Sequence, residues 1–208
     1  MSQEQPRKPD EAEKETVKHE DLVVDVQGAL ARKKAVAESI GGQVLGQDKK
    51  APLSSESVSS GKTNITIGEA LEATALTAGN RPVDYSDAAA IQAAEVRATG
   101  RTNIIPGGVA AAAQSAATRN ARVTKEEEKT KLAEILADAS TKLPADKPVT
   151  RKDAEGVIGA ELRNDPNLCT RPGGVAASIA AAARLNQSHT TTSTNNNQNS
   201  NSLKQKLN

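Results

Sequence analysis

The sequence has no Trp and no Phe, and only one Tyr and one Met among 208 residues. These large side chains bury the most area in ordinary cores. Leu, Ile and Val number 14, 9 and 14, whereas Ala alone numbers 35. The combined share of Leu, Ile, Val and Phe lies below the level of roughly 20% that accompanies disorder. Because ordering each residue costs about 1–2 kcal/mol of backbone entropy, we expect marginal order.

A strong net charge is also lacking, because 27 basic residues balance 26 acidic ones. A nucleic-acid groove normally shows as a basic excess, so we expect no specific nucleic-acid partner. The densest basic cluster, Arg32-Lys33-Lys34, is interpreted as a solvated helix face rather than a nuclear-import signal. The near-neutral balance favours local helix propensity over an extended polyelectrolyte coil.

The residues that build catalytic and metal sites are sparse. Cys169 is the single cysteine, which excludes an intrachain disulfide and a disulfide-stabilised secreted scaffold. His19 and His189 are far apart in the chain, whereas metal ligands usually cluster at close spacing. The sequence therefore predicts no catalytic, cofactor-binding or metal-binding residue and no cofactor, and an enzyme is the least expected class.

No apolar run of 18 residues occurs, and the opening "MSQEQPRKPDEAEKE" is polar where a signal peptide needs an apolar core. We therefore expect a soluble intracellular protein without a transmembrane segment.

The chain repeats itself at an offset of 66 residues. "DAAAIQAAEVR" at 87–97 returns as "DAEGVIGAELR" at 153–163, and "PGGVAAAAQSAATRN" at 106–120 returns as "PGGVAASIAAAARLN" at 172–186. The proline and glycine positions stay in register, which indicates a duplicated module of roughly 60 residues.

Each module contains a predicted helix–Pro-Gly-Gly–helix unit. Asp84 and Thr150 are good N-cap residues, each followed three positions later by an acid, and predict helices over 85–99 and 151–164. After Pro-Gly-Gly, alanine-rich helices are predicted over 109–119 and 175–185. Pro-Gly-Gly itself suggests either an anion nest or a flexible hinge, and the hinge is favoured. Glu95 with Arg97, and Glu161 with Arg163, are interpreted as solvated faces.

A further helix is predicted to begin each module. Thr124 to Glu127 resembles a capping box, and the apolar residues that follow at helical spacing predict an amphipathic helix over 124–143. Its expected counterpart is 66–78, capped by Thr66 and Glu69. A lipid-surface role for 124–143 is disfavoured, because its polar face mixes acids and lysines.

The expected organisation has six parts. A disordered arm covers residues 1–19, a degenerate first repeat with helical periodicity at Val26, Leu30, Ala37 and Ile40 covers 20–47, and a Ser-rich linker covers 48–63. The second repeat covers 64–121, the third covers 124–186, and a disordered Thr/Asn-rich tail covers 187–208.

The repeated motifs and the opening "MSQEQPRKP" resemble the seed maturation protein family of plant late embryogenesis abundant proteins. The resemblance implies a non-enzymatic, cytoplasmic and often also nuclear protein, induced by abscisic acid, that protects proteins or membranes during drying. The first repeat departs from the family pattern by lacking a Gly-Gly-Pro-Ala-type tail. In the last repeat, "NDPNLC" at 164–169 replaces the more usual glycine-containing link.

Two hypotheses remain for the fold. In the first, the chain is largely disordered in water, and alanine-rich helices form conditionally as water is removed, without any β-sheet core. Its partners would be non-specific client proteins or membrane surfaces. In the second, the chain is a folded helical-repeat interaction module, although two full copies are fewer than such stacks usually need. The sequence does not predict the oligomeric state.

Overall fold

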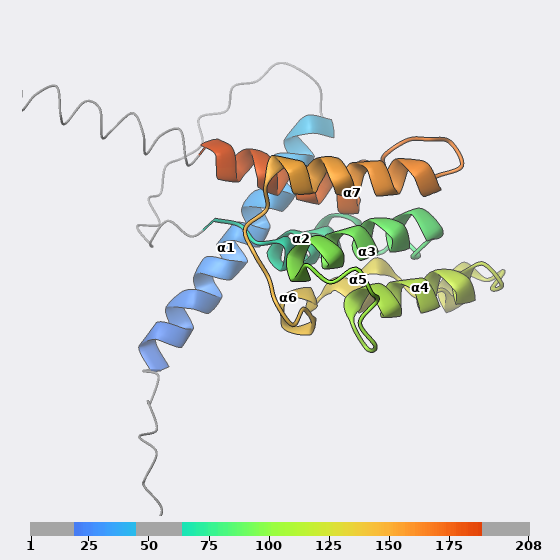
Figure 1. The fold of residues 1–208 in the computed structure, drawn as a ribbon, viewed down its shortest axis with the longest axis horizontal. Helices are drawn as coiled ribbons and strands as arrows, with labels where there is room; N and C mark the ends of the chain where they lie inside the picture. The colour runs from blue at the N-terminus through green and yellow to red at the C-terminus, as the bar shows by residue number, and fades with distance from the viewer. Residues whose placement is uncertain (1–18, 45–63, 189–208) are drawn as a thin grey trace, which may run out of the picture.

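A computed structural model describes residues 19–44 and 64–188, including the side chains of 28–41 and 64–188 (Figure 1). The expected arm, linker and tail lie outside these ranges except at their edges. In the described residues the fold is all-α, as predicted, with two isolated β-bridges and no strand. The helices are α1 (His19–Val44), α2 (Ile67–Ala78), α3 (Tyr85–Thr99), α4 (Val109–Asn120), α5 (Leu132–Leu136), α6 (Ala139–Lys142), α7 (Arg151–Asn164) and a last helix over residues 175–188.

The predicted boundaries of α3 and α7 are confirmed. Asp84 and Thr150 each accept a hydrogen bond from the backbone amide three residues later. Asp87 and Asp153 complete the two capping boxes by accepting from the N-cap backbone. Helix α3 ends at Gly100, whose φ of 70° lies in the left-handed region that glycine adopts without strain.

The continuous helix predicted over 124–143 is wrong. Only a 3₁₀ turn, Glu126–Glu128, follows Thr124, and α5 begins at Leu132. The backbone between them is extended, because the amide of Val83 donates to the carbonyl of Thr130 and the amide of Leu132 donates to the carbonyl of Arg81. These long-range hydrogen bonds outweigh the local cap signal. The N-cap residue of α5 is Lys131, whose amide donates to the side chain of Glu134 in the first turn.

The apolar stripe predicted on that helix belongs to the core rather than to a lipid surface. Leu132, Leu136 and Ala139 are fully buried. In the second repeat, α2 is the equivalent of α5 and α6 in the third, and its predicted capping box of Thr66 and Glu69 is confirmed.

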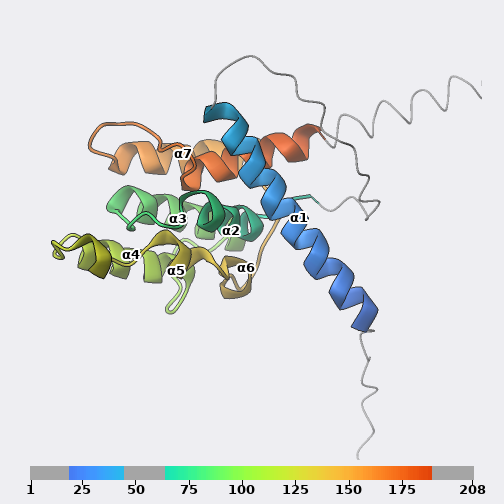
Figure 2. The same cartoon turned by 180° about the vertical axis from the view of Figure 1, so that it is seen from behind.

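Helix α1 crosses the outside of the repeats (Figure 2). Among the side chains that the structure describes on α1, those of Val36 and Ile40 are buried, whereas that of Leu30 is 60% exposed, so the predicted periodicity holds at Ile40 and is wrong at Leu30. The seam of α1 that meets α2 runs instead through Val36 and Ile40.

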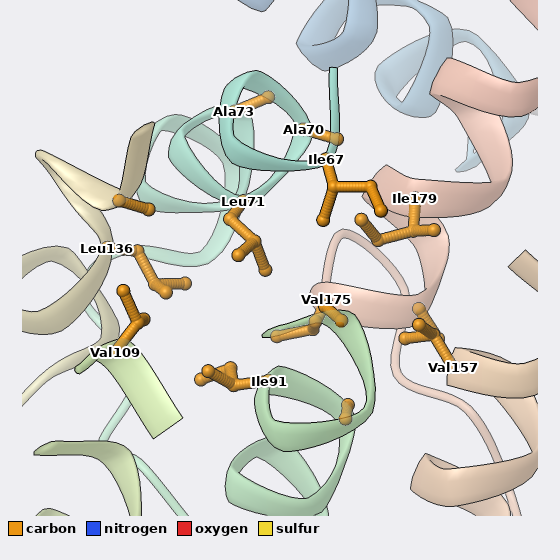
Figure 3. Close-up of a cluster of buried hydrophobic side chains, with 14 of the residues drawn as sticks. Ile67, Ala70, Leu71, Ala73, Ile91, Val109, Leu136, Val157, Val175 and Ile179 are labelled. Atoms are coloured by element: carbon orange, nitrogen blue, oxygen red, sulfur yellow. The ribbon is translucent and has the colours of Figure 1, made fainter. Parts of the chain in front are cut away.

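The core lies between the two repeats, and more than half of its apolar residues are alanines. A few larger side chains meet at its centre (Figure 3), including those of Ile67, Leu71, Ile91, Leu136, Val157 and Ile179. Small side chains let helices approach closely, but each contributes little burial. The core therefore combines close packing with a small apolar area.

Candidate functional site

Two buried asparagines join the repeats to each other. Asn120, at the end of α4, accepts from the amide of Thr130 at 2.8 Å and donates to the carbonyls of Thr130 and Val83 at 2.8 and 2.9 Å. Asn186, in the last helix, accepts from the amide of Ile65 at 2.8 Å and donates to the carbonyls of Ile65 and Val149 at 2.9 Å. Each amide side chain therefore links its own repeat to the first residues of the other.

The contacts between the repeats are reciprocal. The pairing of Val83 with Thr130 has its counterpart in the amide of Val149, which donates to the carbonyl of Ile65 at 3.0 Å. Helices α3 and α7 pack side by side (Figure 1), and Arg97 at the end of α3 donates to the carbonyl of Asp153 at the start of α7. Reciprocal contacts define an approximate two-fold relation. The two repeats thus close on each other instead of stacking as an open solenoid.

Two buried carboxylates cap the alanine-rich helices. Glu95 on α3 is 2% exposed and accepts from the amide of Ala110 in the first turn of α4. Glu161 on α7 is fully buried and accepts from the amides of Arg171 and Ala176 at 2.8 and 2.9 Å. Neither α4 nor the last helix has a side-chain cap of its own, since glycine precedes both. A remote acid therefore satisfies free amides at each helix start and complements the helix dipole.

This arrangement corrects one prediction: Glu95 and Glu161 do not lie on solvated faces, although Arg163 does. The Pro-Gly-Gly segment before α4 forms a turn, in which the amide of Gly108 donates to the carbonyl of Ile105 and Gly107 has a φ of 76°. Amides at the starts of α4 and the last helix, where the disfavoured anion nest would have lain, bind the chain's own carboxylates.

A partly buried ion pair lies at the start of α3, and another lies at the start of α7. Arg81 lies 2.9 Å from Asp87, and Lys147 lies 2.7 Å from Asp153 at the equivalent position. Burial, followed by the neighbouring charge of Asp84, raises the pKa of Asp87 to about 6. At Asp153, burial raises the pKa, but hydrogen bonds from Lys147 and Thr150 outweigh it, so the net shift is downward. The two sites differ first in burial, which is more complete at Asp87, and then in the N-cap residue, which is a carboxylate at Asp84 and a hydroxyl at Thr150.

The basic cluster of α1 also departs from prediction. Arg32 donates two hydrogen bonds to Glu69 at 2.8 and 2.6 Å, and Lys33 pairs with Glu72. These two cations lie against α2 instead of on a solvated face, while Lys34 is exposed. The signal that sequence reasoning missed is the pair of acids on α2, three residues apart on one helix face.

Surface cavities lie on equivalent faces of α4 and the last helix. A cavity of about 640 Å³ lies beside the last helix and is lined by Ile40, Ile158, Thr170, Arg171, Pro172, Gly173, Ala176, Ala177, Ala180 and Arg184. A second, of about 580 Å³, lies beside α4 and is lined by Ile104, Ala111, Gln114, Ser115, Thr118, Arg119, Arg122 and Val123. The cavity beside the last helix differs in being bounded also by α1, through Ile40.

The other residues considered for chemistry are not brought together. Cys169 is exposed, with its sulfur 3.7 Å from the Asp165 carboxylate. His19 begins α1, and His189 lies outside the described residues. In the part of the chain that the structure describes, no group of three or more His, Cys, Asp or Glu could hold a metal ion. Over the same residues, no helix combines the length and apolar character needed to cross a membrane.

Comparisons with known proteins identify relatives of the repeats. The family model described as "Seed maturation protein" matches residues 65–123 and 130–189. "Late embryogenesis abundant protein 47" of Arabidopsis thaliana is 65% identical over 156 residues, which are 75% of this chain and 81% of the relative. "Late embryogenesis abundant protein D-34" of Gossypium hirsutum is 62% identical over 161 residues, which are 76% of this chain and 61% of the relative.

A third relative shows the same pattern. "Late embryogenesis abundant protein 31" of Arabidopsis thaliana is 60% identical over 171 residues, covering 78% of this chain and 64% of the relative. The matched part therefore spans less than two thirds of the second and third relatives. No solved structure matches the chain. The two matched stretches are the two interlocked repeats, and the chain belongs to the seed maturation protein family of late embryogenesis abundant proteins.

Proposed function

We propose that the chain protects cellular proteins or membranes during drying and water deficit, in the cytoplasm and the nucleus of embryo cells. The observation that carries the proposal is a folded state held by a small alanine core and many buried polar contacts, in a chain whose relatives are late embryogenesis abundant proteins. The clients are non-specific protein or membrane surfaces. Protection is neither catalytic nor dependent on a cofactor.

The proposed mechanism is conditional folding. A core made largely of alanine gains little from hydrophobic burial, so the folded state in dilute water is marginal. Removing water weakens the competition for backbone amides and carbonyls, and raises the value of each intramolecular hydrogen bond. The buried caps at Glu95 and Glu161 and the links at Asn120 and Asn186 gain in the same way. The population of the interlocked repeats therefore rises as water activity falls.

The folded surface suits a non-specific protectant. Many exposed charges are paired with the opposite sign, such as Lys125 with Glu128 and Arg151 with Glu155. The described residues expose few large apolar side chains, namely Leu30, Leu76, Tyr85, Ile104 and Leu168. Mixed charge without an extended apolar patch limits self-aggregation when the chain becomes concentrated.

The experiment is a drying assay with a drying-sensitive enzyme. The enzyme is dried alone, with the full chain, or with an equal mass of an unrelated soluble protein, and its activity is measured after rehydration. The proposal predicts more recovered activity with the chain than with the unrelated protein. Recovery no better than with the unrelated protein would overturn it. Leakage from lipid vesicles, measured after drying in the same three mixtures, tests whether the chain also protects membranes.

A second candidate function is a folded helical interaction module that works in water. The reciprocal links of Asn120 and Asn186 favour it, because they make the two repeats one interlocked unit rather than two separate helical hairpins. High helicity with a cooperative thermal transition in dilute buffer would support this alternative over conditional folding.

A further inference from the structure

Helix α1 is held on the repeats by a short set of contacts. Arg32 and Lys33 pair with Glu69 and Glu72 of α2, and Val36 is fully buried one turn later. We call the surface formed by Glu69, Glu72 and Arg184 the α1 dock; Arg184, in the last helix, lies 3.5 Å from the hydroxyl of Ser39. In Figure 2, α1 crosses α2 and the last helix as a separate outer layer.

The repeats position the acids of this dock without help from α1. The second oxygen of Glu69 accepts from the amide of Thr66 as part of the α2 cap. Glu72 accepts from the amide of Ser140 at 2.9 Å and also from its hydroxyl. Each carboxylate therefore has one oxygen fixed by the core and one facing a cation of α1. Such a preorganised surface loses little entropy when a helix binds.

The third repeat does not offer the same surface. Glu134 occupies the position equivalent to Glu69, but Ala137 stands where Glu72 would be, and both are exposed. Only one face of the repeat pair, among the described residues, presents both acids. The matching helix needs two adjacent cations followed by aliphatic residues at helical spacing, and α1 supplies these as Arg32, Lys33, Val36 and Ile40.

We propose that the α1 dock takes α1 from a second copy of the chain, so that concentrated chains exchange this helix. Val44 and Asn64 are separated by 19 residues, a length that spans at most about 60–70 Å. A tether of this length gives an effective concentration of roughly a millimolar for α1 at the dock of its own chain. Once the chain concentration passes that value, the α1 of a neighbour competes equally for an identical site.

Reciprocal exchange closes a dimer in which every contact of the single chain is kept. Its cost is therefore the entropy of association alone, and no new interface is required. The exchange depends on concentration and is independent of the protective role. Drying concentrates the chain, so the same process would link protectant molecules to one another as water is lost.

Cross-linking of full-length chains tests the exchange. In a Cys169→Ser background, one chain carries Ser39→Cys and a second carries Arg184→Cys, and a short bis-maleimide joins cysteines that lie together. The matched control replaces Arg184→Cys by Thr118→Cys, the equivalent exposed position on α4. Near millimolar concentration we expect about ten times more covalent dimer than in the control, falling on dilution. Equal yields from the two pairs at every concentration would overturn the proposal.

Competition identifies the occupant. Excess peptide 19–44 should suppress the specific dimer, whereas a scrambled peptide of the same composition should not. Equal suppression by both peptides would show that any basic helix fills the dock and would contradict a site for this chain's own helix.

Reversing the charges on α1 in one chain and on the α1 dock in another gives a second, independent test. One chain carries Arg32→Glu with Lys33→Glu, and the other carries Glu69→Lys with Glu72→Lys. Each is repulsive within itself, and the two are complementary in both directions between chains. We expect light scattering to give the monomer mass for each alone and the dimer mass for the mixture. Monomers in the mixture, with native helicity in both variants, would contradict the exchange; the cross-linking result decides if either variant fails to fold.

Discussion

Asn120 and Asn186 stand at equivalent positions, and each donates to and accepts from the backbone of the repeat to which it does not belong. Neither repeat can satisfy these groups alone, because Asn120 of the second repeat binds the backbone of Thr130 in the third, and Asn186 of the third binds that of Ile65 in the second. The two repeats are therefore one structural unit. This relation explains how two copies suffice where an open stack needs more.

Replacing Asn120→Ala should destabilise this unit. The amide and carbonyl of Thr130 would lose their side-chain partner in a buried site, where each unsatisfied group costs about 1–3 kcal/mol. We expect the free energy of unfolding to fall by roughly 2–4 kcal/mol. Urea unfolding measures this loss at the glycerol concentration that gives maximal helicity. Asn164→Ala is the matched control, because Asn164 is exposed and bonds only within its own helix. Equal losses from the two substitutions would contradict the interlocking role.

The buried caps predict that replacing a buried glutamate lowers the free energy of unfolding more than replacing an exposed one. Glu161→Gln leaves one oxygen for two amides, and its new NH₂ group faces a donor, so we expect a loss of roughly 2–4 kcal/mol of unfolding free energy. Glu155→Gln, on the same helix, changes a 62%-exposed side chain in a surface ion pair and should cost less than about 1 kcal/mol. Thermal unfolding of both variants in the same glycerol solution compares them. A Glu161→Gln variant as stable as Glu155→Gln would refute the capping account.

Sequence reasoning located α3 and α7 correctly because their signals are local: a cap residue, an acid three positions on, and a helix stop. It failed at 124–143, where Thr124 and Glu127 give the same local signal but the backbone of Thr130 pairs with Val83, far away in sequence. It also misplaced Glu95 and Glu161. Both glutamates occupy the same position in the two copies, and this repetition was the signal in the sequence. It did not identify their partners, which are amides at the start of another helix.

Burial of Asp87, and then the charge of its N-cap residue Asp84, should make the stability depend on pH. The pKa of Asp87 is raised to about 6 from an ordinary value of 3.8, so the folded state binds more protons between these values. The stabilisation from protonated Asp87 is fully present below pH 3.8 and is lost as the pH rises through 6, a change of about 3 kcal/mol.

Asp84→Thr copies the third repeat, where Thr150 is the N-cap residue that precedes Asp153. It removes a neighbouring negative charge, so we expect a lower pKa for Asp87 and a flatter stability profile between pH 4 and pH 6. The reciprocal Thr150→Asp variant should raise the pKa of Asp153. Carboxyl chemical shifts followed by NMR report both values. An unchanged pKa of Asp87 in Asp84→Thr would contradict the assigned cause.

The Pro-Gly-Gly turns offer a matched pair of glycine substitutions. A methyl group at Gly108 would lie 2.6 Å from the buried Glu95 carboxylate, whereas one at Gly174 would meet its nearest neighbour, the Arg171 carbonyl, at 3.1 Å. Gly108→Ala should therefore displace the cap of α4 and destabilise by about 1–3 kcal/mol, more than Gly174→Ala. The urea concentrations at the unfolding midpoints of the two variants, measured at one glycerol concentration, compare their stabilities. The opposite order would show that Glu95 does not depend on this close approach.

The central claim is that the interlocked repeats form increasingly as water is removed. Far-ultraviolet circular dichroism of the full chain, recorded from dilute buffer through rising glycerol to the dried film, measures this directly. The account predicts helicity that rises as water activity falls, with the Asn120→Ala, Asn186→Ala double variant needing lower water activity to reach the same helicity. Full helicity in dilute buffer, with a cooperative thermal transition and no gain on drying, would contradict it.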